Sequence, residues 1–362
     1  MSAANTGNTI DAVKHPEVAI IGGGIIGISL ALEFISSGRR VTVFERGQAM
    51  RESSWAAAGM LAAGDPENPA ALRPLAEWSA RIYPLFLDRV RQLSGAAVPI
   101  RTTRALQGVD HLPEGCSALS EDSLQSLVPD LQAGGRSFFL LDEASLDPRD
   151  LCQALPRAAR AAGVAIQEMA PVSDVSESGS RVEFTAGDER WSADLLIYAA
   201  GAWTGTLAGL PVTPRKGQIV EVRHSGPEVL DVVIRTPEIY LVPRGEGRIV
   251  VGATVEDAGF DRQLRAAATE EVLEAAAALW PPIRRASVMA EWTGLRPATL
   301  DELPVLAPLS LRRWVAAGHF RNGILLAPAT ARLLRQMVLG ETTEVDPAPF
   351  RCGRFAVPSV SS

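Results

Sequence analysis

A glycine-rich turn near the start of the chain has the spacing that binds the phosphates of a dinucleotide. Residues 18–47 read VAIIGGGIIGISLALEFISSGRRVTVFERG, which predicts an apolar strand, a turn, a helix and a second strand. Gly22, Gly24 and Gly27 fit G-x-G-x-x-G. The first glycine permits a tight turn, the second lets backbone approach a pyrophosphate, and the third lets helix and strand pack closely. Glu45, at the end of the second strand, suits a ribose. The segment predicts a dinucleotide site without separating FAD from NAD.

The stretch that follows is rich in small side chains. Residues 51–61 read RESSWAAAGML, in which Ser53 and Ser54 precede three alanines and Gly59. Small side chains permit backbone to run against a flat ring system, where its amides can donate to the ring edge. The same composition is also typical of a helix packed into a core. The residues alone leave both interpretations open.

A polar cluster stands directly before an apolar run close to the end of the chain. Residues 316–330 read AAGHFRNGILLAPAT, which sets His319, Arg321 and Asn322 against side chains that need burial. Polar residues before a helix are commonly caps. A helix N-terminus also stabilises negative charge on a bound group. Pro328 cannot complete a helical hydrogen bond, so the helix could instead begin near this residue.

The first half of the chain carries the helices and strands that would position these residues. The pattern predicts a helix over 69–94, and a second helix that begins at Asp147-Pro148 and is interrupted near Pro156. Residues 193–203, ADLLIYAAGAW, are nearly all apolar, as in a strand buried on both faces. We expect this strand to return to the nucleotide-binding domain.

The second half changes character. Residues 215–256 contain short alternating or β-branched runs separated by Gly, Pro and charged turns, as in an antiparallel sheet. Residues 262–282 then contain a helix ended by Pro281. The fold class that we predict is α/β, with a Rossmann-type domain interleaved with a second domain built on an antiparallel sheet with helices.

Bulk composition excludes several classes of protein. The 362 residues include 35 Lys and Arg against 42 Asp and Glu, a formal net charge of −7. Without a block of like charge, this argues against nucleic acid or an anionic membrane as a partner. Cys116, Cys152 and Cys352 are far apart and odd in number, which argues against a metal cluster or a disulfide framework. Residues 1–17 lack the apolar core of a signal peptide. We therefore expect a cytoplasmic protein that spans no membrane.

Five motifs follow one another along the chain: IIGGGIIG, SSWAAAGML, YLVPRGEGRIVVGAT, TGLRPAT and AAGHFRNGILLAPAT. Together they resemble the glycine oxidases of thiamine biosynthesis, within the D-amino-acid oxidase and sarcosine oxidase superfamily of flavoproteins. The similarity extends from about Val18 to about Phe350. The last two motifs are the most specific, because other members of the superfamily differ there.

The resemblance implies FAD bound without a covalent link. Besides the glycines of the turn, it assigns to the adenosine-diphosphate half Ile25, Ile26, Glu45 and Arg46, with the backbone of Val172 at the adenine. Along the isoalloxazine it places Ser53, Ser54, Ala58, Gly59 and Met60. Around the pyrimidine edge it places His319, Phe320, Arg321, Asn322, Gly323, Ile324 and Leu325. For His319, a cap or packed residue stays an equal alternative to a flavin contact.

The resemblance also implies a small amino-acid substrate. Arg296 would grip the carboxylate with its planar fork, Tyr240 would reach the same carboxylate, and Arg321 would face the substrate. Chemistry would be hydride transfer from Cα of the neutral amine to flavin N5, which needs positioning more than a protein base. Dioxygen would then yield hydrogen peroxide, and the imine would give glyoxylate and ammonia or pass to thiazole synthesis. Glu238 departs from the family pattern and leaves the ranking of glycine, sarcosine and small D-amino acids open.

The expected domains are discontinuous. Residues 16–80, 145–210 and 312–350 would bind FAD, residues 81–144 and 211–311 would bind substrate, and residues 1–15 and 351–362 would be flexible or peripheral. Family members are usually homotetramers, so we expect a homo-oligomer. Two rival functions stay open: a D-amino-acid dehydrogenase that passes electrons to a quinone, and an FAD-binding subunit without turnover of its own.

Overall fold

A mostly parallel sheet forms one end of the molecule. The computed structural model describes residues 14–227 and 229–355, and this sheet has the strand order β17-β18-β11-β1-β2-β7. All neighbouring pairs are parallel except β17 with β18. The strands are β1 (Val18–Ile21), β2 (Val41–Phe44), β7 (Ala165–Gln167), β11 (Leu195–Tyr198), β17 (Val305–Pro308) and β18 (Arg313–Ala317). The strand predicted within residues 193–203 therefore pairs with β1, as expected.

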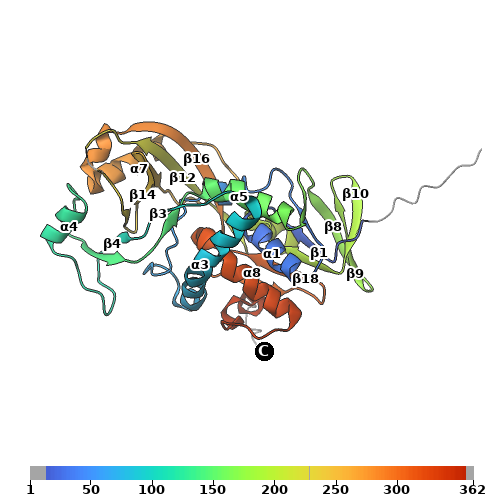
Figure 1. The fold of residues 1–362 in the computed structure, drawn as a ribbon. Helices are drawn as coiled ribbons and strands as arrows, with labels where there is room; N and C mark the ends of the chain where they lie inside the picture. The colour runs from blue at the N-terminus through green and yellow to red at the C-terminus, as the bar shows by residue number, and fades with distance from the viewer. Residues whose placement is uncertain (1–13, 228, 356–362) are drawn as a thin grey trace, which may run out of the picture.

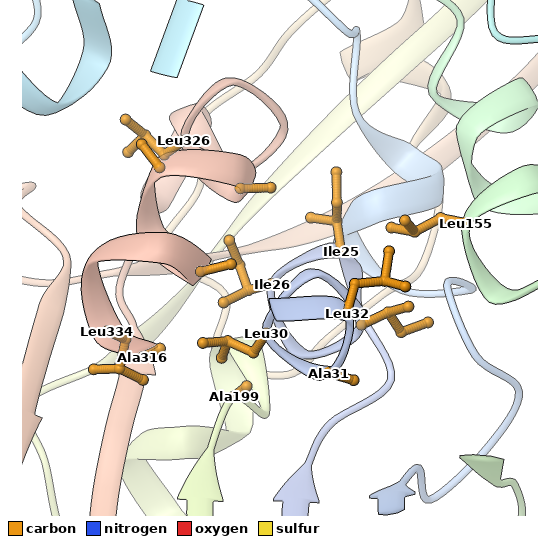
Figure 2. Close-up of a cluster of buried hydrophobic side chains, with 14 of the residues drawn as sticks. Ile25, Ile26, Leu30, Ala31, Leu32, Leu155, Ala199, Ala316, Leu326 and Leu334 are labelled. Atoms are coloured by element: carbon orange, nitrogen blue, oxygen red, sulfur yellow. The ribbon is translucent and has the colours of Figure 1, made fainter. Parts of the chain in front are cut away.

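Four helices form the largest apolar core with this sheet. They are α1 (Ile25–Ser36), α3 (Arg73–Ser94), α5 (Pro148–Ala161) and α8 (Gly323–Leu339). Helices α1, α5 and α8 contact its strands, and α3 packs on α5 and α8. In Figure 2, side chains of α1 lie between Leu155 of α5 on one side and Leu326 and Leu334 of α8 on the other. Because α1 is apolar around most of its circumference, it packs as a central element between its neighbours. Short elements nearby are α2 (Ser53–Ala56), α6 (Thr204–Ala208), and a sheet of β8 (Val172–Ser178), β9 (Arg181–Ala186) and β10 (Glu189–Ala193).

A seven-stranded sheet forms the other end of the molecule, on the left in Figure 1. Its order is β16-β12-β15-β14-β13-β4-β5, antiparallel except for β13 with β4. The strands are β4 (Ala105–Val109), β5 (Ser137–Leu141), β12 (Thr213–Arg223), β13 (Val233–Arg235), β14 (Tyr240–Gly245), β15 (Arg248–Gly252) and β16 (Ser287–Ala298). Helices α4 (Glu121–Leu127) and α7 (Ala266–Leu279) contribute to its core, and β3 (Ile100–Thr102) pairs with β6 (Ser145–Leu146). The predicted fold class is confirmed.

Three details differ from the sequence expectations. Helix α5 continues through Pro156 without interruption, because its buried face packs against the core and outweighs one missing hydrogen bond. Strand β17 joins the parallel sheet although it lies inside residues 211–311, and α3 packs on α8 and α5 although most of it lies beyond residue 80. The expectations for residues 1–13 and 356–362 fall outside the described residues.

Candidate active site

A cavity of about 410 Å³ lies between the two sheets. One wall comes from the carboxyl ends of β1, β2, β11 and β18, and the other from β12, β14 and β16. In open parallel sheets, ligands bind beyond the carboxyl ends of the strands. The cavity therefore lies where the fold itself predicts a nucleotide.

Each glycine of the first turn has a steric reason. Gly22 has φ +114°, and a β-carbon there would lie 2.3 Å from the carbonyl oxygen of Ala199. A β-carbon on Gly27 would lie 1.9 Å from the carbonyl oxygen of Gly22, so this residue lets α1 pack against the turn. Gly24 precedes the first residue of α1 and lines the cavity. The turn has the shape that a pyrophosphate requires.

Two backbone N–H groups at the turn are available to donate hydrogen bonds to an anion. The Ser54 hydroxyl accepts a hydrogen bond from the Ile25 N–H (2.9 Å), but the N–H groups of Gly24 and Ile26 have no acceptor within the described part of the chain. These amides point from the positive end of a helix, which favours a bound phosphate. The Glu45 carboxylate accepts from the N–H of Gly23 (2.8 Å) and of Gly47 (2.9 Å), which fixes it at the cavity wall.

The small-residue stretch runs along the cavity as irregular, largely extended backbone. Only Ser53–Ala56 are helical, and the chain then passes through Gly59 at φ +79°. Side chains of the seven-stranded sheet donate hydrogen bonds to backbone carbonyls of this stretch. Trp292 Nε1 donates to the Ala56 carbonyl (3.0 Å), and Arg244 Nη2 donates to the Ala58 carbonyl (2.5 Å). Among the described residues, no acceptor faces the N–H groups of Ala58 and Gly59. Free amides beside small side chains fit the edge of a flat heterocycle.

Helix α8 begins at Gly323, directly at the cavity, and not at Pro328. Pro328 has no N–H for the carbonyl of Ile324, and the Tyr83 hydroxyl donates to that carbonyl instead (3.0 Å). Ser79 bridges the next gap, because its hydroxyl donates to the Leu325 carbonyl (2.6 Å) and accepts from the Ala329 N–H (3.3 Å). Two side chains of α3 thus keep the helix intact through its proline.

His319 is a packed residue in the loop before α8. It is 2% exposed, and its Nε2 lies 3.0 Å from the Thr330 hydroxyl. Burial lowers the pKa of His319 to about 3, so the ring is neutral at physiological pH. It forms no helix-capping hydrogen bond, which rules out the predicted cap, and it contributes to the cavity wall.

The far end of the cavity gathers groups that suit a carboxylate. The guanidinium of Arg296 lies over Gly217 and donates to the Thr254 carbonyl (3.1 Å). The Tyr240 hydroxyl lies against Gly252, where a β-carbon would stand 2.6 Å from it. Burial raises the pKa of Tyr240, and the nearby Arg296 cation lowers it in part, so the phenol stays protonated. A planar cation and a hydroxyl donor therefore share one wall.

Acidic groups at this end of the cavity all have cationic partners. Arg321 Nη1 donates to Glu67 Oε2 (2.6 Å). Glu238 is paired with Arg136 (2.8 Å) and its side chain is 55% exposed, which places it at the rim of the cavity. Arg235, paired with Glu143 (3.1 Å), was not among the residues predicted from sequence.

The structure brings together nearly all of the predicted site residues. Those that line the cavity are Gly22, Gly24, Ile25, Ile26, Glu45, Arg46, Ser53, Ser54, Ala58, Gly59, Met60, Val172, Tyr240, Arg296, His319, Phe320, Arg321, Asn322, Gly323 and Ile324. Gly27 and Leu325 do not line it: the first packs against the turn, and the second is a buried residue in the first turn of α8. Sequence reasoning missed Trp203, whose ring lies 3.5 Å beneath the Arg46 guanidinium at the cavity wall. A lone Trp after a buried strand gives no local signal for such a contact.

A glycine turn before α1 that suits a phosphate, free amides beside small residues, and a buried pair of Arg296 and Tyr240 that suits a carboxylate are features expected of a nucleotide-dependent oxidoreductase. The family model described as "FAD dependent oxidoreductase" matches residues 17–337, so the chain belongs to the D-amino-acid-oxidase-type family of FAD-dependent oxidoreductases. It is an FAD-dependent amine or amino-acid oxidase. The small residues and unpaired amides along the cavity fit this cofactor.

Relatives of known name agree with this assignment. A glycine oxidase of Geobacillus kaustophilus is 33% identical over 93% of this chain and 97% of its own length. A bifunctional ThiO/ThiG protein of Trichormus variabilis is 32% identical over 94% of this chain, which spans 55% of that longer protein. The crystal structure of glycine oxidase from Geobacillus kaustophilus superposes with a TM-score of 0.89 at 30% identity, covering 95% of this chain and all of that one. No helix among the described residues is long and apolar enough to cross a membrane.

Proposed function

We propose that the protein oxidises glycine: glycine, dioxygen and water give glyoxylate, ammonia and hydrogen peroxide. The observation that carries the proposal is the pair Arg296 and Tyr240, which face one end of the cavity of an FAD-dependent oxidoreductase. A planar guanidinium with a neighbouring hydroxyl selects a carboxylate. Relatives named glycine oxidase, about a third identical over nearly the full length, support the same substrate.

Bound FAD supplies the two-electron oxidising chemistry. The protein's own residues bind and orient the substrate. Arg296 and Tyr240 hold the carboxylate, which fixes the direction in which Cα points. His319 is neutral and bonded to Thr330, and Glu67 is engaged by Arg321, so neither side chain is arranged as a general base. The site therefore works by positioning a neutral amine.

Sarcosine and small D-amino acids belong to the same proposal as secondary substrates. Glu238 stands at the rim and is neutralised by Arg136, so it leaves the carboxylate pair undisturbed. Arg296 and Tyr240 hold one carboxylate, so a second carboxylate on the substrate side chain would have to compete with Glu67 for Arg321. The proposed order of preference places compact neutral amino acids above acidic ones.

The fused ThiO/ThiG relatives support a further part of the proposal, that the product serves thiazole synthesis. A cytoplasmic homo-oligomer fits such a role. Complementation of a thiamine-requiring strain that lacks its own glycine oxidase tests the link. Growth without added thiamine is the expected result, and loss of growth with an Arg296→Ala variant connects it to this site.

The test of the activity is a substrate panel scored by peroxide and glyoxylate release. Glycine, sarcosine, D-alanine, D-aspartate and L-alanine are compared at equal flavin content. Glycine should give one peroxide for each glyoxylate. Turnover only with a quinone acceptor and without peroxide would instead identify a dehydrogenase, and no turnover with any amino acid would leave an FAD-binding subunit.

A further inference from the structure

A fully buried lysine stands directly behind the substrate end of the cavity. The side chain of Lys216 is 0% exposed, whereas lysines are almost never buried without partners. It belongs to β12, next to Gly217. Because side chains alternate along a strand, Gly217 faces the cavity and the Arg296 guanidinium, while Lys216 points away from both. The cation is therefore outside the site but one residue from it.

Both acidic partners of the Lys216 side chain lie in the segment 253–265, which connects β15 to α7. Its Nζ lies 3.3 Å from Asp261 Oδ2 and 3.7 Å from Glu256 Oε2. The backbones of Lys216 and Glu256 also exchange two hydrogen bonds, of 3.0 and 2.9 Å. One buried cation thus fastens both the beginning and the middle of this segment to β12.

The fastened segment touches Arg296. Glu256 accepts a hydrogen bond from the Thr254 hydroxyl (2.8 Å), and the same hydroxyl accepts from the Gln218 N–H (2.9 Å). The carbonyl of Thr254 in turn accepts from Arg296 Nη1 (3.1 Å). Ala253 and Val255, on either side of Thr254, line the cavity. These hydrogen bonds therefore connect Lys216, through Glu256 and Thr254, to the orientation of the Arg296 guanidinium.

We propose that Lys216 is a positioning residue for the substrate-binding arginine: it holds the segment 253–265 against β12 and thereby fixes the Thr254 carbonyl that orients Arg296. The inference rests on the proposed function in one respect, that Arg296 binds the substrate carboxylate. The Arg296 guanidinium packs on Gly217 and donates to the fixed Thr254 carbonyl, so it is already oriented before substrate binds. Less side-chain conformational entropy is therefore lost on binding.

Lys216→Met tests the inference, because methionine keeps most of the length and the apolar stem but removes the charge. Arg215→Met is the matched control: Arg215 lies on the same strand and pairs with Asp257 of the same segment (3.0 Å), but both side chains are partly or largely exposed. Exposed pairs contribute little. Glycolate, a carboxylate without an amine, serves as the probe in calorimetric titrations of the FAD-loaded proteins.

For Lys216→Met we expect the Kd for glycolate to rise about tenfold. The KM for glycine should rise by a larger factor than that by which kcat falls, and trypsin should cleave faster after Arg262 and Arg265. Arg215→Met should stay within twofold of wild type in all of these. A Lys216→Met protein with the glycolate Kd of the control would overturn the inference. If Lys216→Met does not accumulate as a folded flavoprotein, Asp261→Asn carries the same test with the same expected direction and the same overturning result, because it weakens the Lys216 contact without changing a partner of Thr254.

The proposed function has its own separate readout in this experiment. Arg296→Ala should abolish glycolate binding while leaving the tryptic pattern unchanged. Undiminished glycolate binding by Arg296→Ala would reject the carboxylate assignment. Faster cleavage of Lys216→Met with unaltered glycolate affinity would reject only the coupling between the segment and Arg296.

Discussion

The guanidinium of Arg296 rests on the Cα of Gly217, a residue on the neighbouring strand. A β-carbon at position 217 would lie 2.4 Å from both Nη atoms of Arg296. The register of β12 and β16 pairs Gly217 with Gly294, so Arg296, two residues further along β16, reaches diagonally to β12 and occupies the space that the missing side chain leaves. The position of the guanidinium that we propose to bind the carboxylate therefore depends on the missing side chain at Gly217 of β12.

Gly217→Ala should displace this guanidinium while leaving the flavin site intact. Because contacts below 3.0 Å force a shift, we expect the KM for glycine to rise about tenfold, which corresponds to roughly 1.4 kcal/mol of lost substrate binding. Steady-state kinetics at equal flavin content measure it. Gly353→Ala is the control, since a β-carbon at Gly353 meets no atom within 4 Å. A Gly217→Ala enzyme with a wild-type KM would mean that Arg296 does not hold the carboxylate.

Glu45→Gln should weaken FAD binding. The Glu45 carboxylate accepts from the Gly23 and Gly47 N–H groups, and the substitution turns one of these acceptors into a donor that faces a donor. We expect about a tenfold rise in the FAD Kd of the apoprotein, measured by flavin fluorescence. Glu189→Gln removes a charge from the exposed pair with Lys14 and should have no effect. Equal FAD affinities for the two variants would remove Glu45 from the cofactor site.

Tyr83→Phe should destabilise α8, the helix that begins at the cavity. The variant leaves the Ile324 carbonyl without a donor, at a cost of about 1–3 kcal/mol. Pro328→Ala supplies an N–H to the same carbonyl, so the cost of Tyr83→Phe should shrink in that background. Chemical unfolding of the four proteins in this cycle measures the coupling. Strict additivity of the two changes would show that Tyr83 and Pro328 act on different groups.

Acid should destabilise the protein partly through His319. Burial lowers the pKa of His319 to about 3 from an ordinary value of 6.5, so between these pH values the unfolded chain binds a proton that the folded protein rejects. The free energy of unfolding then falls as pH falls from 6.5, by up to about 1.4 kcal/mol per pH unit from this group. His319→Gln should flatten that slope, and His111→Gln, at an exposed position, should not. Identical slopes for His319→Gln and wild type would contradict the assignment of a neutral buried ring.

The nucleotide-binding half of the fold was predictable because its signals are local. The spacing of Gly22, Gly24 and Gly27 fixes a turn within a few residues, and the apolar runs around it define β1, α1 and β2. The two prolines were misleading for the opposite reason. Pro156 and Pro328 interrupt helices by local rules, but packing on α5 and donors from α3 hold both helices together. Tertiary contacts of that kind have no local sequence pattern.

The substrate end was predictable only through resemblance. Arg296 and Gly217 are neighbours across two strands, and Tyr240 meets Gly252 across another pair. Residues so distant in sequence become partners only when the sheet register is known. The same holds for Lys216, which lies in an unremarkable alternating run and acquires its acidic partners from a connecting segment.

Anaerobic mixing with glycine tests the central claim most directly. The wild-type protein should lose its flavin absorbance at about 450 nm as glycine is added, because the substrate transfers two electrons to bound FAD. Readmission of air should restore the absorbance and release one equivalent of hydrogen peroxide. Arg296→Ala, with the same flavin content, should keep its absorbance at glycine concentrations that fully bleach wild type. Wild-type flavin that stays oxidised in saturating glycine, or equal bleaching of both proteins, would contradict glycine oxidation at this site.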